Sequence, residues 1–118
     1  MALEIKKGWG KEVIFASNEL YAGKLLCYDK AGNISSMHFH GKKDETFYIL
    51  SGSVWIVTIN PVDATEIGRK MVKGDLMRLK PLTIHQIQAL EDDTVIIEVS
   101  TPDEPTDNYR VRPGDSQK

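Results

Sequence analysis

The segment HFHGKKDE, residues 38–45, places two histidines two positions apart and a glutamate five positions after the second. Successive side chains of a β-strand point to opposite faces, so His38 and His40 share one face of an extended segment. Glu45 begins the next extended run, and its carboxylate can return to the same region from the neighbouring strand. Two imidazole nitrogens and a carboxylate oxygen are ligands for a divalent transition metal.

The third histidine, His85, opens the run IHQIQAL at 84–90, where it alternates in step with Ile87 and Ala89. The face that carries Ile and Ala is the inward one, so we expect His85 to point into the core. A lone histidine is usually exposed or hydrogen-bonded. Three converging histidines beside a carboxylate each need a partner inside the protein, and one cation satisfies all of them.

This ligand chemistry suits Mn, Fe, Co, Ni or Zn, and we expect one such divalent metal per chain. Cys27 is the only cysteine, which excludes an intramolecular disulfide and a cysteine-rich zinc cluster. A single cysteine is also compatible with a reducing cytosol.

The elements that would position these ligands are short strands separated by turn residues, with no long run at helical period. We expect an all-β protein, either a sandwich or a barrel. The expected strands are residues 11–15, 22–29, 34–40, 46–50, 53–59, 68–72, 75–80, 84–90 and 94–100.

Length and composition favour one globular domain over residues 1–118, since 41% of residues are hydrophobic and 27% are charged. Within it we expect an N-terminal arm over about residues 1–10 and, over about residues 102–118, a strand-free tail that partly wraps the domain and then frays. The net charge of −2 gives no support for a nucleic-acid or membrane partner. The N-terminus lacks the apolar core of a signal peptide, so we expect a cytoplasmic protein.

The spacing of the glycines, histidines and glutamate resembles that of a known family. From Gly32 the chain continues with His38, His40, Glu45 and Gly52 at intervals that resemble the first sequence motif of the cupin superfamily. A segment resembling the second motif begins at Gly74 and carries His85 eleven positions later.

The resemblance implies a small jelly-roll β-barrel, the cupin-like double-stranded β-helix, with a metal held inside by His38, His40, Glu45 and His85. The second motif departs from the family pattern, because Pro81 comes one position late and Ala89 stands where an asparagine is usual. Within the superfamily, GWGKE, the central hairpin and the segment IIEVSTPDEPTDNYRVRPGD resemble the cupin domain of bifunctional bacterial mannose-6-phosphate isomerases.

Four protein ligands leave coordination positions for water or for the oxygens of a substrate. A sugar or sugar phosphate bound there would be isomerised or epimerised through an enediolate. Lys43, Tyr48 and Arg78 are the candidate inward polar groups for substrate binding, and Lys42 and Lys43 are candidates to attract a phosphate. No residue stands out as the general base.

Two other function classes stay open. An Fe(II) site with open positions suits a dioxygenase, and a barrel of this kind also serves as a non-catalytic small-molecule-binding module. We further expect a homodimer, because a single small barrel has sheet edges and apolar residues to cover.

Overall fold

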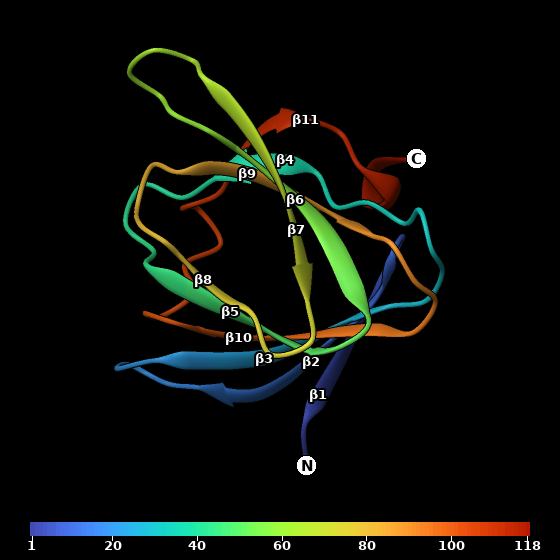
Figure 1. The fold of residues 1–118 in the computed structure, drawn as a ribbon. Coiled ribbons are helices and arrows are strands. Elements are labelled where there is room, and N and C mark those ends of the chain that lie inside the picture. The colour runs from blue at the N-terminus through green and yellow to red at the C-terminus, as the bar shows by residue number, and fades with distance from the viewer.

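The computed structural model describes residues 1–118, which form two antiparallel β-sheets that face each other (Figure 1). The larger sheet has six strands in the order β1-β2-β3-β10-β5-β8. Their bounds are β1 Leu3–Lys7, β2 Gly10–Ser17, β3 Ala22–Tyr28, β10 Thr94–Ser100, β5 Glu45–Ser51 and β8 Leu76–Leu79.

The smaller sheet has five strands in the order β11-β4-β9-β6-β7. Their bounds are β11 Tyr109–Arg112, β4 Met37–Phe39, β9 Ile84–Ala89, β6 Ser53–Ile59 and β7 Glu66–Val72. The expected all-β jelly-roll fold is confirmed, with a short 3-10 helix, Asp115–Gln117, near the C-terminus. No helix is long and apolar enough to cross a membrane.

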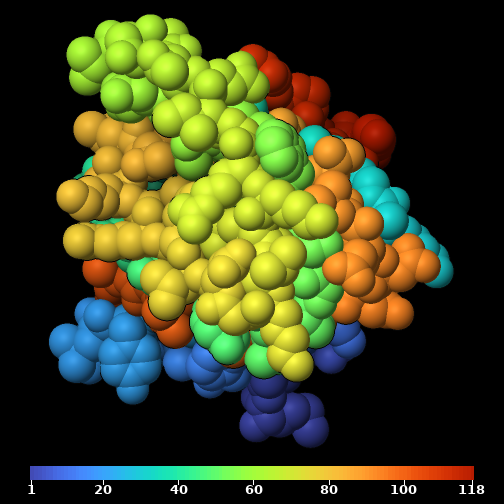
Figure 2. Space-filling model, viewed as in Figure 1, coloured from blue at the N-terminus to red at the C-terminus, as the bar shows by residue number.

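Side chains on the inner faces of the two sheets form the core. In β5, Glu45, Phe47 and Ile49 are buried while the residues between them are more exposed, as period-two alternation requires. The other strands contribute in the same way, and the buried cluster consists of Trp9, Leu26, Tyr28, Phe47, Ile49, Val54, Ile56, Met71, Leu79, Ile87, Ala89 and Ile96. Figure 2 shows that the connection between β6 and β7 projects from this body.

The expectation of a strand-free, fraying tail is wrong. Residues 109–112 form β11, which pairs with β4. Asp115 then accepts hydrogen bonds from the backbone N–H of Ile34 at 2.8 Å and from the Asn33 amide at 3.1 Å. Every residue of β11 is exposed and half are arginines, so its composition resembled a loop. Pairing with an open strand edge, which is not local in sequence, makes it a strand.

The expected N-terminal arm also contains a strand, because β1 pairs with β2 over its whole length. The two strands are joined by a tight connection at Gly8 and Trp9. Of the expected strands, 53–59 and 94–100 have the observed bounds, and most others shift by one or two residues. The expected strand at 34–40 shortens to Met37–Phe39, preceded by an isolated bridge between Ile34 and Gln88.

Candidate metal centre

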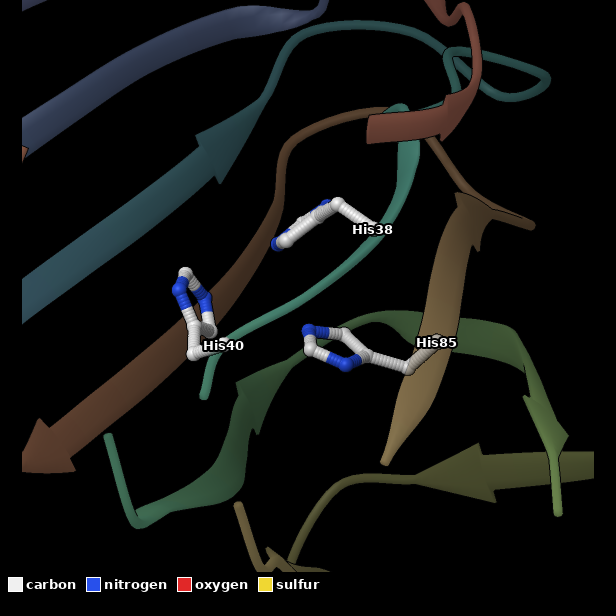
Figure 3. Close-up of side chains that lie close together, drawn as sticks. All are labelled: His38, His40 and His85. Carbon is white, nitrogen blue, oxygen red and sulfur yellow. The ribbon is translucent and has the colours of Figure 1, made fainter. Parts of the chain in front are cut away.

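The three histidines converge inside the barrel. His38 and His40 lie on or just after β4, and His85 lies on β9, directly opposite His38 in the strand register. One ring nitrogen from each histidine lies within 4.8 Å of the corresponding nitrogens of the other two. Figure 3 shows the three side chains directed into a common space. The inward orientation expected for His85 is confirmed, since this residue is 2% exposed.

A hydrogen bond to a backbone carbonyl holds each ring. The Nδ1 of His38 lies 3.0 Å from the Ser36 carbonyl, that of His40 lies 2.7 Å from the Asp107 carbonyl, and that of His85 lies 2.9 Å from the Thr83 carbonyl. A carbonyl oxygen only accepts hydrogen bonds, so each Nδ1 carries the proton. The three Nε2 atoms therefore present lone pairs, the arrangement that metal-binding histidines need.

Glu45 lies beside the three rings at the start of β5. Its Oε1 is 3.2 Å from Nε2 of His85, and its Oε2 is 3.8 Å from Nε2 of His40. Neither Oε2 of Glu45 nor Nε2 of His85 has a hydrogen-bond partner, although both atoms are buried. Unpartnered buried polar atoms are costly. The three Nε2 lone pairs and the carboxylate of Glu45 together form a donor set that suits a divalent cation.

The protonation states agree with this fit. Burial lowers the pKa of His38 to about 3, and the neighbouring His85 acts in the same direction. Burial also lowers the pKa of His40, although its hydrogen bond to Asp107 opposes the shift. For Glu45, burial favours the neutral acid, but the charge of Lys43 favours the carboxylate, and the pKa is lowered. Neutral imidazoles and an ionised carboxylate are the forms that ligate metals.

The loop between His40 and Glu45 is shaped by Asp107. Its carboxylate accepts hydrogen bonds from the backbone N–H groups of Gly41 at 2.7 Å, Lys42 at 3.0 Å and Lys43 at 3.1 Å. Its own carbonyl accepts the Nδ1–H of His40. One residue of the C-terminal segment thus fixes both the loop and a candidate ligand.

Lys43 is the cation of a buried ionic cluster next to the histidines. Its Nζ is 2.7 Å from Asp103, 3.0 Å from Glu98 and 3.4 Å from Glu45. Burial opposes the charge on Lys43, but the three carboxylates raise its pKa above the usual value. Lys24 joins the cluster through Asp103 at 2.8 Å. Lys43 therefore contacts Oε2 of Glu45, the oxygen that also faces His40, and fixes the orientation of this carboxylate.

A cavity of about 490 Å³ opens beside these groups. Its walls include the three histidines, Glu45 and the ionic cluster, together with apolar side chains such as Trp9, Leu26 and Phe47. The volume is within the range of small-ligand sites.

Of the three predicted substrate-binding residues, one lines the cavity and two point outward. Lys43 lines the cavity. The inward orientation expected for Tyr48 and Arg78 is wrong: Tyr48 is 40% exposed, and Arg78 pairs with Asp44 on the exterior. Because Glu45 and Phe47 point inward on β5, the intervening alternation turns Tyr48 outward. Lys42 is also at the surface, with its side chain 79% exposed.

The charged residues of the cavity wall that were missed from the sequence include Lys24, Glu98 and Arg110. A signal existed for two of them. Lys24 and Glu98 occupy inward positions of β3 and β10, next to the inward apolar residues Leu26 and Ile96, and a charge at such a position indicates a site. Arg110 carried no such signal, because its strand was not predicted.

No known family's sequence model matches the chain, and no curated protein matches it. Several solved structures, in contrast, match the fold of the chain. A structure of CapF with the inhibitor 3-isopropenyl-tropolone superposes with a TM-score of 0.83 at 21% identity, covering 95% of this chain and 34% of that one. CapF from Staphylococcus aureus gives a TM-score of 0.82 at 19% identity, with coverage of 95% and 34%.

Oxalate decarboxylase from Bacillus subtilis gives a TM-score of 0.80 at 21% identity, covering 93% of this chain and 30% of that one. The chain has the cupin-like jelly-roll fold. It spans about a third of the length of the structures that it matches, and identities this low show the fold alone. The finer resemblance to mannose-6-phosphate isomerases stays a prediction.

Proposed function

We propose that this protein holds one divalent transition metal through His38, His40, His85 and Glu45 and uses it to bind a small oxygen-bearing ligand in the adjoining cavity. The observation that carries the proposal is that the Nδ1–H group of each histidine donates a hydrogen bond to a backbone carbonyl. This leaves three Nε2 lone pairs that converge beside the carboxylate of Glu45. Mn, Fe, Co, Ni and Zn all suit this donor set.

For the reaction, we propose isomerisation or epimerisation of a sugar or sugar phosphate, of the mannose-6-phosphate isomerase type that the sequence resembles. A bound divalent metal supplies a Lewis acid that polarises a carbonyl oxygen. The chain itself must then move a proton between neighbouring carbons of the sugar. The apolar walls formed by Trp9, Leu26 and Phe47 limit the access of water to this step.

Glu98 is the group that we propose for this proton transfer. It lies on the inward face of β10, lines the same cavity as the histidines and is 6% exposed. Burial and the charge of Glu45 raise its pKa, while Lys43 at 3.0 Å opposes the shift. A carboxyl group held in this way can accept a proton and return it.

Metal analysis tests the first part of the proposal. Protein prepared without chelators is expected to contain about one transition metal per chain. The variants His38→Ala and His40→Ala are expected to lose it, whereas Gln88→Ala, on the outer face of β9, is expected to keep it. A metal content that is unchanged in both histidine variants would refute the site.

Exchange of substrate protons with solvent tests the reaction. Metal-loaded protein in deuterium oxide is expected to incorporate deuterium next to the carbonyl of an aldose, a ketose or one of their phosphates, as measured by NMR. Glu98→Gln is expected to slow this exchange at least a hundredfold while keeping the metal. If no sugar exchanges, oxygen uptake by the Fe(II) form would indicate a dioxygenase, and inactivity in both assays a binding module.

We also propose a homodimer. The outer face of the six-stranded sheet, here called the apolar sheet face, carries Val13, Phe15, Leu25, Tyr48, Leu50, Leu76, Val95, Ile97 and Val99. The outer face of the smaller sheet instead carries polar residues such as Gln86, Gln88 and Lys70. A sheet that is apolar on both sides is normally covered on both. A second copy buries the same apolar side chains on each partner through one two-fold contact.

A further inference from the structure

The charged side chains that line the cavity are almost all paired with one another. Lys7 lies 3.5 Å from Glu12, Lys24 lies 2.8 Å from Asp103, and Lys43 bridges Glu45, Glu98 and Asp103. Glu104 pairs with Lys42 at 3.5 Å. Arg110 is the exception, because its guanidinium takes part in no ion pair and no side-chain hydrogen bond although it lines the same cavity.

The position of Arg110 is set by strand pairing. Arg110 on β11 lies directly opposite His38 on β4 in the antiparallel register. Directly opposite residues in neighbouring strands project to the same face, so Arg110 emerges on the face that carries the candidate metal ligand. The preceding pair, Tyr109 and Phe39, lies on the other face, where the two rings stack with centroids 5.1 Å apart.

Arg110 also remains accessible. It is exposed, as expected for a residue on the edge strand of the smaller sheet, so it stands where the cavity meets solvent. A ligand in the cavity can therefore contact this guanidinium as well as the histidines. The lysines cannot take the same role, since Lys43 is already bound by three carboxylates and Lys42 points to the surface.

We propose that Arg110 binds the anionic end, a phosphate or a carboxylate, of a ligand whose remaining oxygens face the metal site. This inference rests on the proposed function only for the ligand oxygens that face the metal site; binding of the anionic end requires Arg110 alone. A guanidinium presents a planar fork of donors that matches the oxygens of phosphate and carboxylate groups, and such pairs are charge-assisted and often bidentate. The metal centre and Arg110 together define a cavity selective for small organic oxyanions.

The test uses inorganic phosphate and malonate as probes, with glycerol as a neutral control, and isothermal titration of the metal-loaded full chain. Wild-type protein is expected to bind at least one of the two anions and not glycerol. Arg110→Gln is expected to weaken that binding about tenfold or more. Because Arg110 has no partner in the protein, this variant is expected to keep the wild-type melting temperature.

Arg112→Gln is the matched control. Arg112 lies on the same strand, is exposed and does not line the cavity, so the same loss of charge is expected to change affinity less than about twofold. Equal weakening in the two variants, or no binding of either anion to the wild type, would overturn the proposal. A preference for phosphate or for malonate assigns the anionic group.

The same titration on metal-free protein separates this inference from the proposed function. If the chain holds no metal, anion binding that still depends on Arg110 and not on Arg112 supports the anchor while the metal proposal fails. If metal is bound at the histidines but anion binding does not depend on Arg110, the anchor fails and the metal proposal stands.

Discussion

At the scale of single residues, the candidate site contains two kinds of buried polar group: atoms without a hydrogen-bond partner, and charges that form ion pairs. Nε2 of His85 and Oε2 of Glu45 are buried without a hydrogen-bond partner, whereas Lys43 forms ion pairs with three carboxylates. A buried charge is tolerated when it is paired, and removal of one partner leaves the others uncompensated. The main role of Lys43 is therefore structural: its charge balances the buried carboxylates.

Replacement of Lys43 by methionine is expected to destabilise the fold by about 3–5 kcal/mol, because the buried carboxylates of Glu45 and Glu98 lose their counter-charge. Thermal or denaturant unfolding of the metal-free protein measures the effect. Lys42→Met is the control: its side chain is 79% exposed, and the expected change is within about 0.5 kcal/mol. Equal stability of the two variants would contradict the assignment of Lys43 to a buried ionic cluster.

At the scale of elements, the connection between β5 and β6 leads from the larger sheet to the smaller one and turns at Gly52, whose φ of 78° favours glycine. A Cβ at this position would lie 2.3 Å from the Thr94 hydroxyl and 2.9 Å from its Cα, so neither the backbone conformation nor the space allows a side chain. This turn holds β5, and with it Glu45, beside β10.

Gly52→Ala is expected to lower the melting temperature more than Gly74→Ala. Gly74 has a similar φ of 92° but open space around the added Cβ. Conformational strain of about 1–3 kcal/mol is expected in both variants, and the clash with Thr94 adds to it only at Gly52. Calorimetry of the pair tests this order, and an equal loss would show that the contact with Thr94 is relieved without cost.

The C-terminal segment is a second element with a specific anchor. Asp115 accepts hydrogen bonds from Ile34 N–H and the Asn33 amide, and Lys118 lies 3.0 Å away. Burial acts to raise the pKa of Asp115, but these contacts outweigh it and lower the pKa below 3.8. A carboxyl whose pKa is lowered on folding stabilises the protein above its unfolded pKa, and the contribution is lost as the pH falls through the folded value.

Asp115→Ala is therefore expected to cost about 1–3 kcal/mol at neutral pH and to show a smaller further loss of stability than the wild type as the pH falls below about 4. Denaturant unfolding at several pH values measures both effects. Glu19→Ala, in an exposed bend, is the control. Parallel acid profiles for the wild type and the Asp115 variant would contradict this role.

At the scale of the whole molecule, the two outer sheet surfaces differ in polarity. The apolar sheet face lies on the six-stranded sheet, and Ile97 stands near its middle, opposite Leu25 on one side and Tyr48 on the other. The proposed burial of this face in a homodimer would account for the outward apolar residues of β10, which are Val95, Ile97 and Val99.

Light scattering at micromolar concentration is expected to give twice the chain mass of 13.3 kDa for the wild type. Ile97→Glu is expected to give the monomer mass, because it places a charge in the middle of the proposed contact. Gln88→Glu, on the polar outer face of the smaller sheet, is expected to remain dimeric. A monomeric wild type would refute the homodimer.

The sequence by itself determined what depends on local spacing. Period-two alternation placed His38 with His40 and turned His85 inward with Ile87 and Ala89, and the apolar runs located most strands. The same alternation, started from Glu45, also predicts the outward Tyr48 that our sequence reasoning placed inward. These features need only the geometry of one strand.

Only the tertiary structure decided which distant residues meet. Two of the three partners of Lys43, Glu98 and Asp103, come from β10 and from the segment after it, 55 residues or more along the chain. No local pattern encodes these contacts. Arg110 faces the cavity because β11 pairs with the edge of β4 in a register that sets it opposite His38. A polar strand acquires its structure from the edge it joins, since the backbone groups of that edge need partners whatever the side chains of the joining strand are.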